Sequence, residues 1–150
     1  NRVDTYFYYN NILVYKMDST GRLLWNTYVP KNQHSINDGG YYLSYAHYFD
    51  NNKLYFIFND NSKNYDDNNE YISASDPKTA HFNSWRNTIA VVSMSIEDGK
   101  YVRKSIGGKK LTDIVVVPRL CIENLEENEL FLYGKSGNKH RFGRLQFSVE

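Results

Sequence analysis

The sequence is poor in the residues and patterns that mark most active sites. Its 150 residues include one cysteine, Cys121, so no internal disulfide can form. Lys and Arg number 18 against 17 Asp and Glu, a balance that does not favour a nucleic-acid partner. No apolar run is long enough to span a membrane. The histidines are isolated from one another, and no GxSxG, CxxC or phosphate-loop pattern occurs, so the sequence predicts no catalytic residue and no cofactor-binding residue.

What the sequence has instead is a regular succession of strand and turn signals, with almost no helical periodicity. Residues 12–17 and 22–29 flank residues 18–21, a turn in which the Asp18 side chain can accept from the backbone ahead and Gly21 takes a positive φ. This pattern predicts a hairpin. The same signals predict further strands at residues 41–49, 53–59, 89–96, 101–106, 114–122, 129–133 and 141–149. The predicted fold class is all-β.

Two parts of the chain, about 76 to 78 residues apart, resemble each other. Residues 14–25 can be laid over residues 92–103, each reading as strand, turn with glycine, strand. Residues 54–60 can likewise be laid over residues 130–136. A repeat of this kind is typical of stacked sheets, which cannot each bury both faces alone.

The repeat predicts two four-stranded antiparallel sheets, from residues about 11–60 and 87–134, with a loop insertion at 61–85 and a final strand at 141–149. We interpret residues 1–150 as a single β domain. A complete propeller needs at least four blades of roughly 40 residues, so two units are too few. Either the two sheets pack face to face as a pair, or the chain is a fragment of a larger propeller; a first residue other than Met favours the fragment.

A partial propeller leaves sheet faces and edges that must be covered. We therefore expect the chain to pack against the remainder of its parent chain, a protein partner or a second copy of itself. The core of the two sheets is expected to contain large apolar residues of the predicted strands, namely Trp25, Phe56, Phe58, Val91, Val116 and Leu130.

The insertion at 61–85 has no counterpart in the second unit and is too polar at its start for a strand interior. We expect a long exposed loop, with one helical turn beginning at Asp76 and Pro77. Because long loops on a rigid scaffold often carry function, recognition is expected here. The candidate binding residues are Asn64, Tyr65, Tyr71 and Trp85.

Oxygen-bearing side chains recur at every second residue at the start of this insertion, a spacing that can turn ligands toward one hard cation. The calcium candidates are Asp60, Ser62, Asn64 and Asp66. The EF-hand pattern is not met, since Tyr65 and Tyr71 stand where that pattern asks for Gly and Glu. The alternative is a solvated loop rich in Asn and Asp.

The segment 31–40 is a second polar connection between strands. Gly39 and Gly40 can leave backbone N–H groups free to bind an anion, and His34 can act as a base at neutral pH. The alternative is a turn-rich connection in which Asn37 and Asp38 satisfy the backbone of the segment itself.

The residues Thr20-Gly21-Arg22-Leu23-Leu24-Trp25 resemble the tryptophan-docking motif of quinoprotein-like propeller blades, in which a Trp packs on the next blade. The second unit departs from this motif, because Arg103 stands where Trp is expected. The whole chain resembles an uncharacterised β-propeller-like secreted or envelope protein family of Bacteroidota. That resemblance rests on residues 12–25, 29–33, 37–40, 53–60 and 141–145. It implies no catalytic residues.

From these observations we expect a non-catalytic protein- or glycan-binding or scaffold module of the bacterial cell envelope, in a periplasmic, cell-surface or secreted location. The alternative is a fragment of a glycan-active or quinone-linked propeller enzyme. A glycan-active enzyme would need two carboxylates about 5 to 10 Å apart across one pocket, and Asp60, Asp66 and Glu70 are the candidates.

Overall fold

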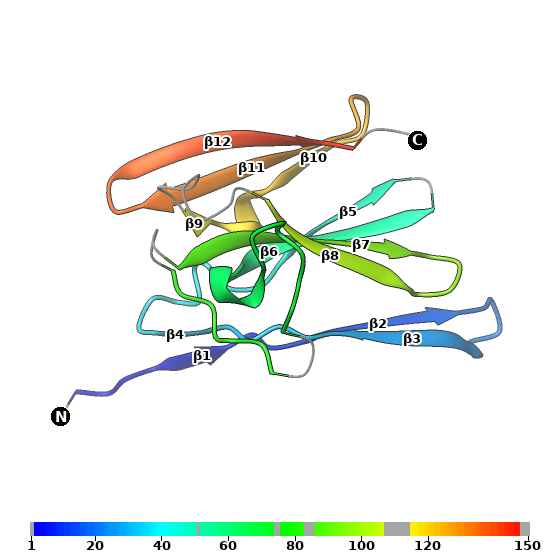
Figure 1. Ribbon diagram of the computed structural model, residues 1–150, viewed down its shortest axis with the longest axis horizontal. Coiled ribbons are helices and arrows are strands. Elements are labelled where there is room, and N and C mark those ends of the chain that lie inside the picture. The colour runs from blue at the N-terminus through cyan, green and yellow to red at the C-terminus, as the bar shows by residue number, and fades with distance from the viewer. Residues whose placement is uncertain (1, 51, 74–75, 83–85, 107–114, 148–150) are drawn as a thin grey trace.

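The structure is a computed structural model that describes residues 2–50, 52–73, 76–82, 86–106 and 115–147. The chain is all-β, as predicted, and its strands form small antiparallel sheets arranged in three layers (Figure 1). The described residues hold no α-helix and only short 3-10 turns.

The first layer contains two separate pairs of strands. β2 (Ile12–Met17) and β3 (Leu23–Val29) form the predicted hairpin, and β1 (Tyr6–Tyr8) pairs with β4 (His34–Ile36). At the hairpin turn, the Asp18 side chain accepts hydrogen bonds from two backbone N–H groups ahead of it, at 2.9 and 3.0 Å, as the sequence predicts.

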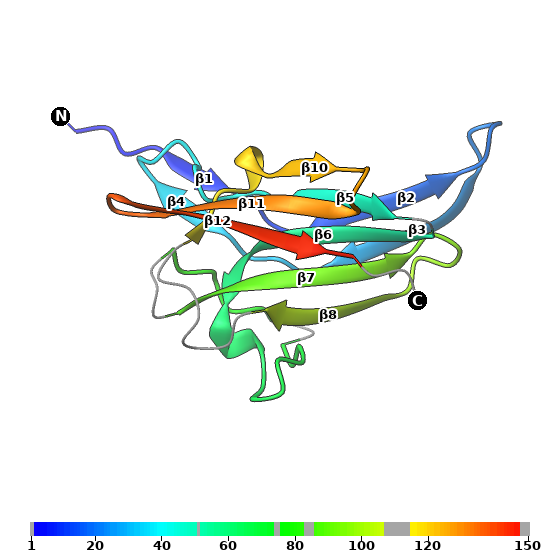
Figure 2. The ribbon, with the colours of Figure 1, turned by 90° about the horizontal axis from the view of Figure 1, so that it is seen from above.

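The middle layer is one four-stranded sheet in which each strand pairs with its neighbour in the sequence (Figure 2). Its strands are β5 (Ala46–Asp50), β6 (Lys53–Asn61), β7 (Asn87–Ser95) and β8 (Tyr101–Ile106). The insertion between β6 and β7 also covers part of the β8 edge, because the Ser105 N–H donates to the Asn69 carbonyl at 2.9 Å.

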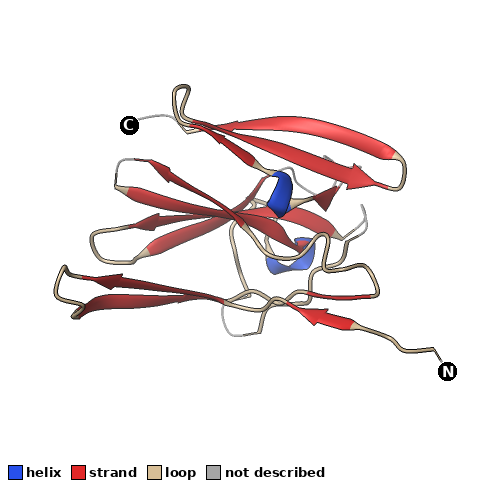
Figure 3. Cartoon of the chain, turned by 180° about the vertical axis from the view of Figure 1, so that it is seen from behind, coloured by secondary structure: helices blue, strands red, loops and turns tan. Residues whose placement is uncertain are grey.

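The third layer lies on the opposite side of the middle sheet from the first (Figure 3). Its strands are β9 (Val115–Val116), β10 (Ile122–Asn124), β11 (Glu129–Ser136) and β12 (Lys139–Gln146). β11 pairs with β12 along its whole length, with β10 near its start and with β9 near its end.

The sheets do not coincide with the predicted four-stranded units. The second hairpin of the unit 11–60 and the first hairpin of the unit 87–134 join in the middle sheet, because β6 and β7 pair from Lys53 opposite Ser95 to Asn61 opposite Asn87. The hairpin β2–β3 therefore lies in another layer. No sheet closes on itself in the part of the chain that the structure describes, so a propeller stays a prediction.

The predicted strand 114–122 is interrupted. Pro118 begins a 3-10 turn, Pro118–Leu120, that separates β9 from β10. Proline has no backbone N–H to donate to a neighbouring strand, so a strand seldom continues through it. The last predicted strand, 141–149, is present as β12, which begins two residues earlier and ends at Gln146, whereas Val149 lies outside the described residues.

One apolar cluster joins the first layer to the middle sheet. Phe56, Phe58 and Val92 of the middle sheet pack there with Ile12 and Val29. Phe56 and Phe58 are buried, as predicted.

A second apolar cluster joins the middle sheet to the third layer. Ile57 packs there with Val116, Leu130 and Phe147. Val116 and Leu130 are buried as predicted, whereas Val91 is only partly buried.

Trp25 of β3 packs on the next layer, where its indole Nε1 donates to the carbonyl oxygens of Ile96 and Glu97 at 3.2 and 3.1 Å. The turn between β7 and β8 can lie against the indole ring because Gly99 has no side chain. A Cβ at this position would lie only 2.7 Å from the Trp25 ring. The predicted core residue Trp25 is therefore partly buried, at the joint between two layers.

The outer face of the β2–β3 hairpin is apolar and open to solvent. Leu13, Tyr15 and Met17 alternate along β2 with side chains that face the middle sheet, and each is more than half exposed, at 60%, 55% and 58%. Leu24 and Tyr28 of β3 are also exposed, at 45% and 51%. A strand with apolar residues on both faces is typical of a sheet covered on both sides.

Candidate functional site

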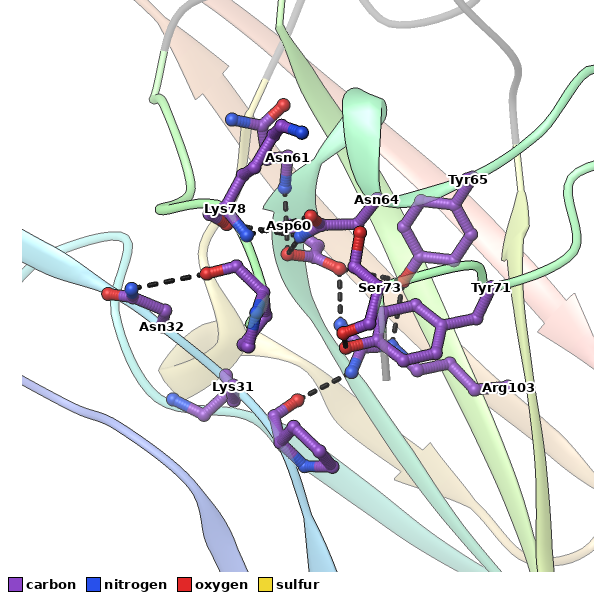
Figure 4. Close-up of polar contacts among 12 residues, drawn as sticks. Lys31, Asn32, Asp60, Asn61, Asn64, Tyr65, Tyr71, Ser73, Lys78 and Arg103 are labelled. Atoms are coloured by element: carbon purple, nitrogen blue, oxygen red, sulfur yellow. Dashed lines mark hydrogen bonds and ion pairs between the residues drawn. The ribbon is translucent and has the colours of Figure 1, made fainter. Parts of the chain in front are cut away.

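A buried ionic cluster lies where β6 ends, between the middle sheet and the first layer (Figure 4). The Asp60 carboxylate and the Arg103 guanidinium form an ion pair, and both side chains are 1% exposed. The Tyr65 hydroxyl donates to Asp60 Oδ2 at 2.8 Å and accepts from Arg103 Nε at 2.8 Å. Arg103 also donates to the Pro30 carbonyl and lies 3.9 Å above the ring centre of Tyr71. One cation thus joins the insertion, the sheet and the first layer.

A second cation, Lys31, is buried next to this cluster. Its Nζ donates to Gln33 Oε1 at 2.8 Å and to the carbonyl oxygen of Tyr9. Burial lowers the pKa of Lys31 to about 7, and the positive charge of Arg103 also lowers it, whereas the negative charge of Asp60 opposes the shift. Lys31 therefore gives up its proton at a much lower pH than an exposed lysine does.

The Tyr65 hydroxyl stays protonated at physiological pH. Burial raises its pKa well above the usual value, and the neighbouring Asp60 charge raises it further, while Arg103 acts in the opposite direction. The hydroxyl therefore serves as a fixed donor to Asp60. The cluster is closed to solvent, so its chemistry is structural: it holds the start of the insertion against the sheet.

Side-chain amides hold the later part of the insertion, residues 77–80, in place. Asn64 donates to the Lys78 carbonyl at 3.0 Å and accepts from the Lys78 N–H at 2.8 Å. Asn61 donates to the Thr79 carbonyl at 2.8 Å. From the first layer, Asn32 donates to the Pro77 carbonyl at 3.2 Å and its own carbonyl accepts from the N–H of residue 80 at 2.9 Å. These bonds fix an irregular segment that has little apolar burial.

This fixed segment forms one wall of a groove with a volume of about 550 Å³. Both predicted recognition segments contribute to the groove. His34 comes from the segment 31–40, and most of the other lining residues come from the insertion 61–85, which is followed directly by Arg86. It is lined by His34, Asn61, Lys63, Lys78, Thr79, Ala80, His81, Phe82 and Arg86. Its volume is within the range of small-molecule sites, about 300 to 1,000 Å³. We call this groove, defined by these lining residues, the basic groove.

The calcium candidates have different surroundings in the structure. Asp60 is paired with Arg103, and its Oδ1 accepts from Asn64 Nδ2 at 2.9 Å. Asp66 Oδ1 accepts from the backbone N–H groups of Asn68 and Glu70, at 2.9 Å each, and so closes its own turn. The described residues contain no group of three or more His, Cys, Asp or Glu side chains that could hold a metal ion. Calcium at these positions stays a prediction, and it competes with the Arg103 ion pair.

The predicted binding residues are mostly inside the protein. Asn64 and Tyr65 are 0% and 6% exposed, so they shape the insertion and present no side chain to a partner, which corrects the expectation of an exposed loop. Tyr71 is partly buried, and its hydroxyl donates to the Ser73 carbonyl at 2.6 Å. Trp85 lies outside the described residues. No helical turn begins at Asp76, because residues 76–82 run as irregular chain bonded to side-chain amides.

The segment 31–40 follows the turn-rich interpretation. Gly39 and Gly40 have positive φ, at 68° and 67°, but Asp38 Oδ1 accepts from the Gly40 N–H at 2.8 Å. Asn37 instead accepts from the N–H of Thr5, which lies outside the segment, at 2.8 Å. Asp38 therefore satisfies backbone of the segment itself, as the alternative predicted, whereas Asn37 ties the segment to the residue that precedes β1.

Sequence reasoning missed Arg103 and Lys31 as members of a buried cluster. Arg103 follows Val102 and precedes Lys104, so its strand carries no clear signal of an inward-facing charge, and the partner carboxylate is 43 residues away in the sequence. It also missed the wall formed by residues 77–80, since the amides that hold it come from positions 61, 64 and 32.

Comparison with known proteins found no matching family model, no matching curated protein and no matching solved structure. Among the described residues, no helix is both long and apolar enough to traverse a bilayer.

Proposed function

We propose that the chain is a non-catalytic binding module whose ligand occupies the basic groove. The observation that carries this proposal is that the groove joins residues of both predicted recognition segments, with a wall at 77–80 held by buried amides. A wall that is already fixed loses little conformational freedom when a ligand binds, and this lowers the entropic cost of recognition. The proposed location is the bacterial cell envelope or outside the cell, and the ligand class is glycan.

The enzymatic alternative is not favoured by any specific observation. The carboxylates that it names are engaged elsewhere: Asp60 with Arg103, Asp66 with its own turn, and Glu70 with Lys104 at 2.7 Å.

The proposal also includes a scaffold role for the outer face of the β2–β3 hairpin. Because side chains alternate along each strand, every second residue of β2 and β3 points to this face, and none of these residues is charged. They are Leu13, Tyr15, Met17, Leu24, Asn26 and Tyr28. Two copies can therefore place this face together without burying a charge, so the occupant we propose is a second copy.

The binding proposal is tested with a labelled chain on a glycan array. The groove variant combines His81→Ala with Phe82→Ala, and the matched control combines His140→Ala with Phe142→Ala on the third layer, where Phe142 is 81% exposed. We expect the control to bind like the native chain and the groove variant to lose binding. Equal binding by all three proteins would reject the groove as the recognition site.

The scaffold proposal is tested by light scattering over a range of protein concentrations. The native chain is expected to show a mass that rises toward a dimer, and Tyr15→Lys is expected to shift that rise to higher concentration, because it places a charge in the apolar face. Val102→Lys, at an exposed position of β8, is the control. A native chain that stays monomeric at every concentration would overturn the scaffold proposal.

A further inference from the structure

The basic groove has a charge distribution unlike that of the whole chain. The chain is nearly neutral, with a formal net charge of +1. The groove, in contrast, is lined by Lys63, Lys78 and Arg86 together with two histidines, and no carboxylate is among the described residues of its lining. Like charges placed around one hollow repel one another, and an anion in that hollow would relieve the repulsion.

These three cations are not used to stabilise the fold. Within the described residues, none of the three forms an ion pair, whereas Arg103, Lys100 and Lys104 each pair with a carboxylate. All three are also exposed, so their charged ends can reach a ligand without first leaving a protein partner.

The backbone that carries the cations is fixed before any ligand arrives. Lys78 is held at both its N–H and its carbonyl by the Asn64 side chain, which is 0% exposed. The Arg86 carbonyl accepts from the Ser62 N–H at 2.8 Å, next to Lys63. The positive charges therefore sit on anchored positions on two sides of the groove.

The groove also offers an aromatic ring beside these charges. Phe82 stacks on Tyr42, with ring centres 5.9 Å apart and an interplanar angle of 17°. A ring supported in this way presents a rigid apolar surface, against which the C–H face of a sugar ring can pack. Thr79 adds a hydroxyl suited to the hydroxyl groups of a sugar.

We propose that the basic groove binds an anionic oligosaccharide, one whose sugar rings carry carboxylate or sulfate groups. This inference rests on the proposed function and names its ligand class. Lys63, Lys78 and Arg86 bind the anionic groups, and Phe82 packs against a sugar ring. A nucleic acid is a poorer fit, because the chain as a whole is nearly neutral and its basic residues are scattered among acidic ones.

The test measures binding of three oligosaccharides by titration calorimetry: a sulfated heparin fragment, an oligogalacturonate that carries only carboxylates, and a neutral cello-oligosaccharide. Inorganic sulfate is titrated as a fourth probe. We expect at least one anionic oligosaccharide to bind more tightly than the neutral one and than sulfate. Raising the salt concentration is expected to weaken that binding. A preference for the heparin fragment or for the oligogalacturonate identifies the anionic group.

The charge variant combines Lys63→Gln, Lys78→Gln and Arg86→Gln. The control combines Lys53→Gln, Lys139→Gln and Arg141→Gln, which remove the same charge from exposed positions away from the groove. We expect the charge variant to bind the anionic oligosaccharide about a hundredfold more weakly than the control, since charge-assisted hydrogen bonds are lost.

Four outcomes would overturn the inference. If the neutral oligosaccharide binds as well as the charged ones, and Phe82→Ala alone removes binding, the anion inference fails while the proposed function stands. If sulfate binds as tightly as the anionic oligosaccharides, the site is a simple anion site. If no probe binds, or if the charge variant and Phe82→Ala both bind like the native chain, the groove is not a glycan site, and the proposed function fails together with the inference.

Discussion

Asn59 and Asp60 are neighbours at the end of β6 and connect the middle sheet to different layers. Asn59 faces the third layer, where its amide donates to the Val116 carbonyl and accepts from the Val116 N–H at 3.2 Å. Asp60 faces the first layer and forms an ion pair with Arg103 of β8, whose guanidinium in turn donates to the Pro30 carbonyl of the first layer. The third layer is thus joined to the sheet by neutral hydrogen bonds, and the first layer through a buried charged side chain.

The difference has an energetic consequence. A neutral amide that exchanges bonds with backbone groups costs little to desolvate. A buried ion pair costs more to desolvate, and removing one partner leaves an uncompensated charge. The two joints should therefore respond differently to mutation, to pH and to the replacement of polar by apolar side chains.

The largest effect is expected for Asp60→Asn. This nearly isosteric change leaves the Arg103 guanidinium buried without its counter-charge, and we expect a loss of about 3 to 5 kcal/mol in the free energy of unfolding. Urea denaturation measures it. The triple variant Asp60→Leu, Tyr65→Phe and Arg103→Met replaces the whole cluster by apolar side chains and is expected to recover most of the loss. A triple variant as unstable as Asp60→Asn would contradict this account.

The pH dependence of stability is expected to differ between native protein and Lys31→Met. An unfolded lysine has a pKa of about 10.4, whereas burial lowers the pKa of Lys31 to about 7. Between these values the unfolded state binds more protons, so native stability rises with pH by up to about 1.4 kcal/mol per pH unit. Lys31→Met removes that contribution.

Urea denaturation at pH 7.5, 8.5 and 9.5 measures this effect. The native protein and the variant share every titratable group except Lys31, so the difference between their two profiles reports on Lys31. Parallel pH profiles of the two proteins would show that Lys31 is not desolvated.

A smaller effect is expected for Asn59→Leu. The substitution leaves the N–H and carbonyl groups of Val116 and the Tyr42 carbonyl without their amide partner. We expect a loss of about 2 kcal/mol in the free energy of unfolding, which does not change between pH 7.5 and 9.5 because no charge is involved. Urea denaturation at both pH values tests this. A pH-dependent loss would mean that the two joints are coupled.

The sequence predicted the strands well but not how hairpins combine into sheets. Alternation and turn residues are local, so the hairpins at 12–29, 46–59 and 89–106 follow from them directly. The pairing of β6 with β7 spans the insertion, and no local signal distinguishes it from a pairing within the unit 11–60. Long-range pairing depends on which apolar faces can be covered together. The predicted repeat placed the boundary between the two sheets after residue 60, whereas β6 and β7 pair across the insertion.

The sequence indicated the segments 31–40 and 61–85 as recognition elements, and whether either binds a ligand stays a prediction. Residues of both segments line the basic groove, a proximity that the sequence did not predict. The run from Asp60 to Glu70 was expected to be exposed because it is polar. However, Asp60 continues the alternation of Phe56 and Phe58, so its side chain faces inward. Polarity alone does not report exposure when a partner such as Arg103 is distant in the sequence.

The smallest effect on stability is expected for Glu70→Gln. Comparing this variant with Asp60→Asn shows whether the large loss expected at Asp60 comes from the burial of its charge or from the charge itself. Glu70 pairs with Lys104 at 2.7 Å, and Lys104 is the residue next to Arg103 on β8. Both side chains of this pair are about half exposed, at 45% and 57%, so water replaces much of what the mutation removes. The β8 edge stays covered, since the Ser105 N–H bonds to a backbone carbonyl of the insertion.

We therefore expect Glu70→Gln to lower the free energy of unfolding by less than about 1 kcal/mol, and by still less in high salt. Urea denaturation with and without added salt measures both effects. Asp60→Asn removes the same charge from a side chain that pairs with the same strand, but in a buried position. Equal losses for the two variants would show that the charge itself, rather than its burial, holds the insertion against the sheet.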